Sequence, residues 1–209
     1  MKSNLATVMV VDDDSGVRNA MRVLLRSVGL NSMLFASAQE FLAAYQPSQV
    51  GCLVLDIRMP GMSGLELQQE LNLRGAVIPV IFMSGHGDIP MAVEAMQHGA
   101  FDFLQKPFRD QDLLDRIQRA IAKHQQLQQS LGEHERIRGL LAELTPRERE
   151  VLDYLTQGKQ NKAIAQELDV SPRTIEIHRA RVMEKMNAHS VAELVRMMMD
   201  VGKQVAAQR

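Results

Sequence analysis

The 209-residue sequence contains no tryptophan, two tyrosines and a single cysteine, Cys52. A single cysteine excludes an internal disulfide, so the sequence is not typical of a small disulfide-stabilised secreted domain and fits a reducing compartment. Cys52 opens an apolar run, which predicts a small buried hydrophobic side chain. No apolar stretch approaches the roughly 18 residues of a membrane-spanning helix. Leu5–Val11 runs directly into aspartates, unlike a signal peptide. We therefore expect a cytoplasmic protein without membrane association.

The chain also lacks a strong net charge, and its formal charge is −1. The two ends differ slightly. Residues 1–122 hold 10 Lys and Arg against 13 Asp and Glu, a balance of −3, whereas residues 143–209 hold 11 against 10, a balance of +1. An excess of one positive charge is too small for a polycationic domain that binds nucleic acid over its whole surface. Any nucleic-acid surface must therefore be a local patch.

The first part of the chain alternates short β-type runs with segments of helical apolar spacing. The expected strands are Thr7–Val11, Met33–Phe35, Cys52–Leu55, Val80–Met83 and Phe101–Leu104. The expected helices are Val17–Val28, Ala38–Ala44, Gly64–Leu71, Ile89–Met96 and Gln111–Lys123. This alternation predicts an α/β doubly wound, five-stranded parallel sheet with helices on both faces. Ligands of such sheets bind beyond the carboxyl ends of the strands.

Charged and polar residues follow four of these strands: Asp12 and Asp13, Asp56, Ser84 and Lys106. Three carboxylates placed together repel one another unless a cation lies among them, and oxygen ligands suit Mg²⁺. A lysine and a hydroxyl beside them can stabilise the charge on a phosphoryl group while one aspartate acts as the nucleophile. Each residue alone is readily explained as part of a turn, but the complete set predicts phosphoryl chemistry.

Four blocks of this half resemble the signature blocks of two-component response-regulator receivers, over residues 5–123. They are Val10–Asp14, Leu55–Gly64, Met83–Gly85 and Lys106–Pro107. The resemblance implies a flavodoxin-like strand order, Asp56 as phospho-acceptor, Ser84 and Lys106 as contacts of the phosphoryl group, and Phe103 as the switch aromatic. It also implies that Asp13, Asp56 and the backbone carbonyl of Arg58 hold Mg²⁺ or Mn²⁺, with Asp12 helping through water. The Lys106–Pro107 bond is then expected to be cis.

Residues 124–142 are rich in Gln, Glu, His and Arg and are interpreted as a largely helical linker between domains 1–123 and 143–209. A 4-3 spacing runs from Leu113 to His134, so the last helix of the first domain can continue into the linker. Gly132 weakens this stripe, and a solvated tether without an apolar seam is an equal alternative.

Residues 143–209 carry no strand signal and predict a small all-α domain of four helices. Thr145 to Glu148 form a capping box with Pro146 at the first helical position, and Ser171 and Pro172 repeat the device. A short helix, Asn161–Leu168, precedes a turn at Asp169–Val170, and Ser190 caps the last helix. Two short helices joined by a tight turn are typical of a helix-turn-helix unit.

The segments Leu144–Leu152, Asn161–Ala165 and Thr174–Arg179 resemble the LuxR/FixJ-type helix-turn-helix. Gly85–Asp88 and Met91–Met96 also look similar to the FixJ branch. The expected DNA-binding residues, from the resemblance and from exposed charge, are Lys162, Arg173, Thr174, Glu176, His178, Arg179, Arg181 and Lys185.

Several residues of the third C-terminal helix have more than one interpretation. Glu176 either accepts from cytosine or is a surface residue paired with Arg179. His178 is either a packing residue or a phosphate contact. Helical spacing predicts that Ile175, Val182 and Met186 belong to the core.

We therefore expect a response regulator that accepts a phosphoryl group on Asp56 from a sensor histidine kinase. It then dimerises, releases its helix-turn-helix domain, or both, to bind promoter DNA and regulate transcription with RNA polymerase as a further partner. It is not expected to be an enzyme beyond its own phosphorylation and dephosphorylation. A phosphatase with an Asp56 phosphate intermediate and a pure phosphorelay carrier are alternatives, but neither uses the DNA-binding half.

Overall fold

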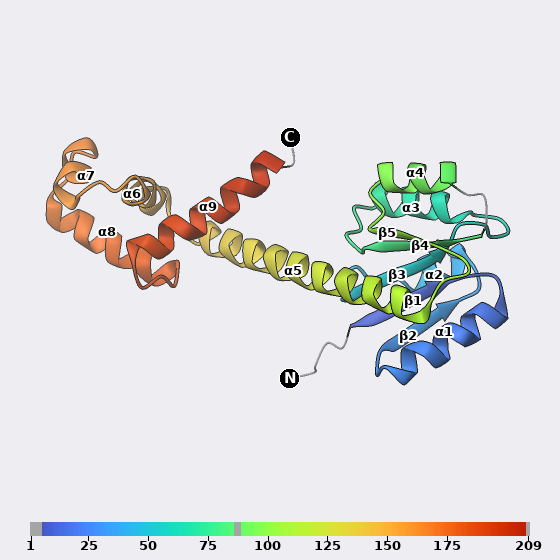
Figure 1. The fold of residues 1–209 in the computed structure, drawn as a ribbon. Coiled ribbons are helices and arrows are strands. Elements are labelled where there is room, and N and C mark those ends of the chain that lie inside the picture. The colour runs from blue at the N-terminus through green and yellow to red at the C-terminus, as the bar shows by residue number, and fades with distance from the viewer. Residues whose placement is uncertain (1–5, 86–88, 208–209) are drawn as a thin grey trace. The chain divides into compact units, whose positions relative to one another are not determined.

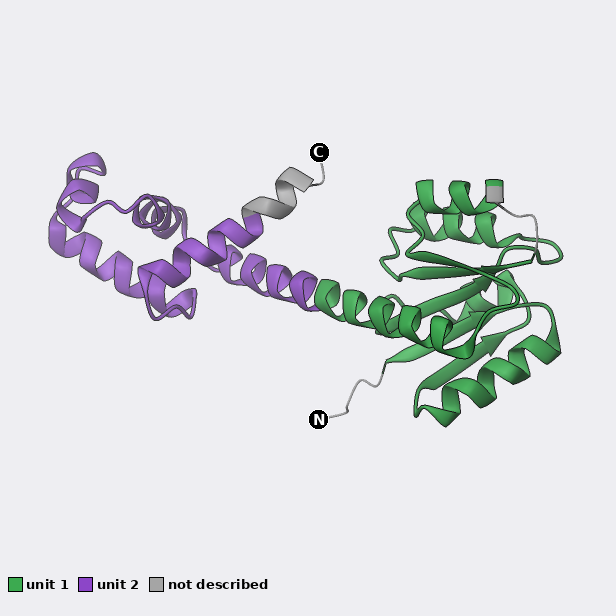
Figure 2. Cartoon of the chain, viewed as in Figure 1, with its two compact units in different colours: residues 1–128 green, residues 129–209 purple. Residues whose placement is uncertain are grey.

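The structure, a computed structural model, describes residues 6–85 and 89–207, and its contacts divide the chain into two compact units. Unit 1 is Met1–Gln128 and unit 2 is Gln129–Arg209 (Figure 2). Within the described residues, we find no helix with the length and apolar character needed to span a bilayer.

Unit 1 contains a five-stranded sheet in the order β2-β1-β3-β4-β5, and every neighbouring pair of strands is parallel (Figure 1). The strands are β1 (Thr7–Val11), β2 (Asn31–Phe35), β3 (Gly51–Asp56), β4 (Val80–Ser84) and β5 (Asp102–Gln105). All residues of β1, β3 and β4 are buried, because helices cover both faces of the sheet. The predicted fold class and flavodoxin-like order are confirmed.

Two apolar clusters lie on opposite faces of this sheet. One joins the strands to α1 (Ser15–Ser27) and α5 (Asp110–Ala142). The other joins them to α2 (Ala38–Ala44), α3 (Gly64–Leu73) and α4 (Ile89–Gln97). Side chains of a strand alternate between the faces, as Val8 and Met9 of β1 show, so each strand contributes to both clusters. Cys52 is fully buried in the first cluster, as expected.

Helix ends differ from the predicted ones where polar residues form the first turn. Helix α1 begins at Ser15 rather than Val17, because the Asp14 carboxylate accepts the backbone N–H groups of Gly16 and Val17. Such a cap supplies acceptors to N–H groups that have no partner inside the helix. Apolar spacing cannot detect a turn without apolar residues, so the prediction placed the start too late.

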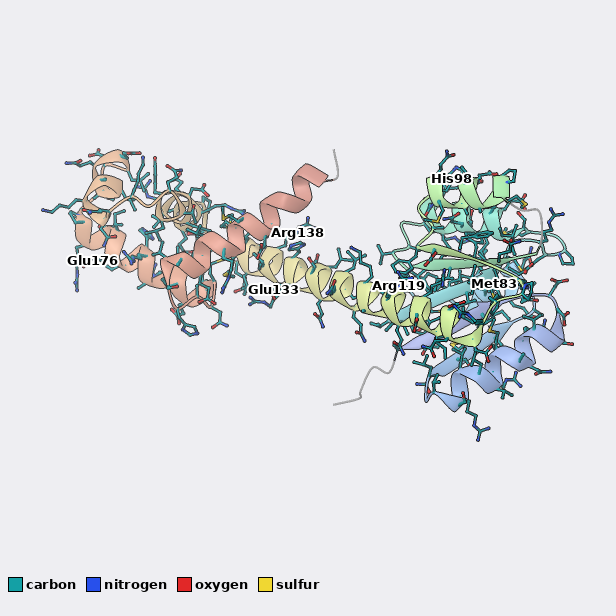
Figure 3. The ribbon with its side chains drawn as sticks, viewed as in Figure 1. Met83, His98, Arg119, Glu133, Arg138 and Glu176 are labelled. Atoms are coloured by element: carbon teal, nitrogen blue, oxygen red, sulfur yellow. The ribbon has the colours of Figure 1, made fainter. Side chains whose placement is uncertain are left out.

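Helix α5 runs without interruption from Asp110 to Ala142, so the last helix of unit 1 does continue through the expected linker. Both ends of the segment 124–142 are packed. His124 is fully buried and its Nδ1 lies 2.8 Å from the carbonyl oxygen of Gly51, whereas Ile137 and Leu141 belong to the core of unit 2. Between them Leu127 and Leu131 are half-buried, and Glu133 and most of the other residues are exposed (Figure 3).

Unit 2 adds four helices to the end of α5: α6 (Pro146–Thr156), α7 (Asn161–Glu167), α8 (Pro172–Lys185) and α9 (Val191–Ala207). Both predicted capping devices are present, the box of Thr145 with Glu148 and the Ser171 side chain that accepts the Thr174 N–H. Ile175, Val182 and Met186 are fully buried, which confirms them as core residues. The predicted small all-α domain is therefore confirmed.

Candidate functional site: a phospho-acceptor pocket and a DNA-reading helix

The carboxyl ends of β1, β3 and β5 bring Asp12, Asp56 and Lys106 together. The Lys106 ammonium lies 2.7 Å from Oδ1 of Asp56 and 3.0 Å from Oδ2 of Asp12. Because these strands are parallel members of one sheet, their carboxyl ends lie at the same edge, and residues distant in sequence meet there. Of the predicted carboxylates, Asp12 and Asp56 thus meet Lys106.

This pocket holds two buried carboxylates against one ammonium group. Asp12 is 1% exposed and Asp56 is 8% exposed. Burial raises the pKa of Asp12 above its ordinary value, and the hydrogen bond from Lys106 offsets this only in part. Burial also lowers the pKa of Lys106, but hydrogen bonds to Asp56 and Asp12 outweigh it and leave that pKa raised. One ammonium therefore does not fully compensate the negative charge of the pocket.

Backbone groups next to the strand ends fix the orientation of both carboxylates. Asp12 Oδ1 accepts the N–H of Asp14 at 2.9 Å, and Asp56 Oδ2 accepts the N–H of Arg58 at 2.9 Å. Helix α3 begins close behind Asp56, since a Cβ added to Gly64 would lie 2.3 Å from the Asp56 carbonyl oxygen. Only glycine permits this approach, so Gly64 positions the loop that follows Asp56.

The other predicted receiver residues lie on β4 and β5. Ser84 is 2% exposed, and its carbonyl accepts the N–H of Lys106 at 2.6 Å. Phe103 is half-buried and packs against the cluster of α2, α3 and α4. The Lys106–Pro107 bond is cis, as expected. Of the segment Gly85–Asp88, residues 86–88 lie outside the described residues.

The predicted metal ligands are only partly assembled. Asp13 is exposed beside the pocket, while Asp12 and Asp56 both bind Lys106. Within residues 6–85 and 89–207, no three His, Cys, Asp or Glu side chains are grouped so that they could hold a metal ion. The donor types nevertheless fit a hard divalent cation, because the pocket offers carboxylate oxygens and uncompensated negative charge.

Helix α8 and the start of α7 present the predicted DNA-binding residues at the surface of unit 2. Lys162, Arg173, Glu176 and Arg181 are exposed, whereas Thr174, His178 and Arg179 are half-buried. Figure 3 labels Glu176 on this helix. Glu176 pairs at 3.4 Å with Arg173, not with Arg179 as one interpretation expected. Arg179 instead donates to Asn161 of α7, at 3.3 Å, which fixes its guanidinium between the two helices.

Lys185, which the resemblance implies as a DNA contact, forms an ion pair within unit 2. Its ammonium lies 2.7 Å from Oε2 of Glu148 and 3.1 Å from the carbonyl oxygen of Glu143. The Glu148 side chain is only 3% exposed and also accepts the N–H of Thr145 at 2.9 Å. A buried carboxylate needs a cation, and Lys185 is the cation that α8 places there. Lys185 is therefore half-buried and paired with a buried carboxylate.

A groove beside the pocket was not foreseen. It has a volume of about 760 Å³ and is lined mainly by apolar side chains of α1 and by Lys106, Pro107 and Phe108. Val23 lines it and is 70% exposed, although it is a large apolar residue. In the sequence, only the position of Val23 beside the apolar stripe of α1 indicates this groove.

Both units of the chain match known protein families. Residues 8–118 match the family model of the response regulator receiver domain. Residues 142–198 match that of bacterial regulatory proteins of the luxR family. The chain is 46% identical over 195 residues to the transcriptional regulatory protein FixJ of Bradyrhizobium diazoefficiens, covering 93% of this chain and 95% of FixJ. It is 44% identical to the response regulator protein TmoT of Ectopseudomonas mendocina, covering 94% of this chain and 89% of TmoT.

Solved structures give the same result. The response regulator StyR superposes with a TM-score of 0.87 at 45% identity, covering 93% of this chain and 98% of StyR. Full-length FixJ from B. japonicum superposes with a TM-score of 0.58 at 44% identity, covering 95% of this chain and 98% of FixJ. Receivers generally use a divalent metal ion, and the two domains together imply a cognate kinase and promoter DNA as partners. The chain belongs to the two-component response regulators that join a receiver to a LuxR-type DNA-binding domain.

Proposed function

We propose that this response regulator accepts a phosphoryl group on Asp56 from a sensor histidine kinase and then binds promoter DNA to regulate transcription in the cytoplasm. The observation that carries the proposal is the Lys106 ammonium between two buried carboxylates, one of which is Asp56. In the transfer, an Asp56 oxygen forms the new bond to phosphorus while the bond from phosphorus to the kinase nitrogen breaks.

The surrounding residues have distinct roles in this step. Lys106 stabilises the negative charge of the phosphoryl oxygens, and Ser84 offers a hydroxyl to one of them. Asp12, Asp13, Asp56 and the Arg58 carbonyl are the residues that would hold Mg²⁺ or Mn²⁺. When bound, this cation supplies positive charge to the transferring group. A phosphatase or a pure phosphorelay carrier shares this pocket, but the LuxR-type domain argues for a transcription regulator.

The apolar groove beside Lys106 is the proposed contact of the kinase, because a protein that delivers phosphate to Asp56 must approach this edge. Val23→Asp places a charge in that contact and should slow transfer from the kinase about tenfold or more. Transfer from acetyl phosphate should be unchanged, because the variant leaves the pocket intact. Arg22→Asp, an exposed neighbour that does not line the groove, is the matched control. Equal slowing with acetyl phosphate would contradict the docking role of Val23.

DNA is proposed to contact the exposed face of α8 and the start of α7. Lys162, Arg173, Thr174, Arg179 and Arg181 are placed to hold phosphates or groove edges. Glu176 carries a carboxylate that can accept from cytosine N4. Glu176→Ala should therefore change the base preferred at one position when binding sites are selected from a random duplex pool. An unchanged preference would leave Glu176 as a surface residue held by Arg173.

Activation is proposed to act through α4 and β5. Phosphate on Asp56 would draw Ser84 inward and let Phe103 rotate toward the core, which repacks the surface around Val93 and Met96. These two side chains are 53% and 47% exposed, unusual for large apolar residues and suited to a dimer contact. Phosphorylation must favour the active form by a few kcal/mol. Release of residues 143–209 from a resting receiver is the second proposed route.

Gel shift and sedimentation with and without a phosphodonor test the function and separate the two routes. We expect phosphorylation to double the sedimenting mass and to strengthen binding to paired half-sites about one helical turn apart. Stronger binding without a change of mass would indicate release instead of dimerisation. DNA binding that ignores the phosphodonor would contradict regulation through Asp56. RNA polymerase is the proposed partner of the DNA-bound form.

A further inference from the structure

His178 lies on α8 at the border between the core of unit 2 and the surface. Ile175, three residues before it, and Val182, four residues after it, are fully buried, whereas Glu176 and Ile177 are exposed. Residues three or four apart share one side of a helix, so His178 stands on the buried side but is itself half-buried. One edge of its ring therefore faces protein and the other faces solvent.

The two ring nitrogens have different surroundings. Nδ1 is enclosed by protein and has no hydrogen-bond partner among the described residues. Nε2 is not one of the buried side-chain atoms that lack a hydrogen-bond partner. No described residue forms a hydrogen bond with it either, so this nitrogen is open to solvent. Nε2 is thus the nitrogen that a molecule outside unit 2 can reach.

This difference decides which nitrogen carries the proton. An enclosed N–H without an acceptor loses its hydrogen bond to water, which costs more than enclosing a lone pair. The neutral ring with hydrogen on Nε2 avoids that cost. The other neutral form places its N–H on Nδ1, so the surroundings of the ring disfavour it.

We propose that His178 binds DNA as a neutral donor of fixed direction, through Nε2–H, to an acceptor atom of the duplex. The inference rests on the proposed DNA-binding function and assigns His178 a role distinct from that of the arginines around it. Phosphate oxygens and the O6 and N7 atoms of guanine are acceptors of this kind. A neutral donor displaces no counterion, so His178 adds affinity without adding to the salt dependence of binding.

The protonation state is measured first, in the full chain without DNA. Nitrogen-15 spectra of histidine-labelled protein at pH 7, with His178→Gln to assign the signal, should show a protonated Nε2 and an unprotonated Nδ1. A protonated Nδ1, in either the second neutral form or the imidazolium, would overturn the proposal. This result does not depend on whether the duplex or a promoter is known.

The DNA role is measured on the chain phosphorylated with a small phosphodonor, with duplexes selected from a random pool. Glutamine places its amide NH₂ where Nε2 of histidine lies, whereas asparagine places it where Nδ1 lies. His178→Gln should bind within about threefold of the unaltered chain, and His178→Asn should bind about tenfold more weakly with an unchanged salt slope. Arg179→Gln, in comparison, should lower the salt slope by about one unit.

Each outcome decides between defined alternatives. Weakening by His178→Asn on all sequences identifies a phosphate oxygen as the acceptor, and weakening on one base only identifies a base edge. Equal binding of both variants overturns the role of His178 while leaving the proposed function intact. Failure of the unaltered, phosphorylated chain to bind any duplex overturns the proposed function and the role of His178 with it.

Discussion

Asp56→Asn should abolish phosphorylation of the chain by acetyl phosphate or by a kinase. The substitution keeps the shape of the side chain but replaces the nucleophilic carboxylate oxygen with an amide, which cannot form the acyl phosphate. The unaltered chain should gain one acid-labile phosphoryl group in the presence of Mg²⁺, read as a mass increase or as a shift on a phosphate-affinity gel. Asp153→Asn, an exposed carboxylate of unit 2, is the matched control and should be labelled normally.

Two further substitutions separate the contributions of the pocket. Asp13→Ala should block labelling if the proposed cation is held there, and raising the Mg²⁺ concentration should restore part of it. Lys106→Ala should impair the response to phosphate more than the uptake, since it removes the ammonium that bridges Asp12 and Asp56. Normal labelling of Asp56→Asn would contradict the assignment of the acceptor, whatever the other two variants show.

Lys185→Met should lower the free energy of unfolding of unit 2 by about 3 kcal/mol, because it leaves the buried Glu148 carboxylate without its cation. Urea unfolding followed by circular dichroism measures this change. Arg181→Met, an exposed arginine of the same helix, should change stability by less than about 0.5 kcal/mol. Glu148→Gln added to Lys185→Met should recover part of the loss. Unchanged stability with a salt slope lowered by one unit would restore Lys185 as a phosphate contact.

The same ion pair gives unit 2 a defined pH dependence. The hydrogen bond from Lys185, together with that from the Thr145 N–H, lowers the pKa of Glu148 from its usual 4.5 to about 2. The folded pKa lies below the unfolded one, so this stabilisation is complete above pH 4.5 and is lost as the pH falls toward 2. Lys185→Met should remove most of this pH dependence in urea unfolding at pH 5 and pH 3.

The positions of Asp12, Asp56, Ser84 and Lys106 could be predicted because each follows a recognisable strand, and parallel strands end at one edge. Short helices of unit 2 could be predicted because their caps use local residues, such as Thr145 with Glu148. The partner of Lys185 could not be predicted, because Glu148 lies 37 residues away in the sequence. No local pattern shows which positively charged side chain pairs with this buried carboxylate.

The packing within residues 124–142 was equally hidden from the sequence. Residues 124–142 are polar in composition, and that composition predicted a linker. Burial of His124 in unit 1 and of Ile137 in unit 2 depends on a few apolar faces at the two ends of a polar helix. Composition is an average over the segment, so it does not show which helical turns pack against a core.

Helix α5 also ties together the unfolding behaviour of the two units. A polar helical segment of about a dozen residues, with Gly132 in its middle, is marginal in water on its own. It is held because His124 is anchored at one end and Ile137 at the other, in separate cores. Melting either core would remove one anchor, so the segment should fray from that side and expose its amides to hydrogen exchange.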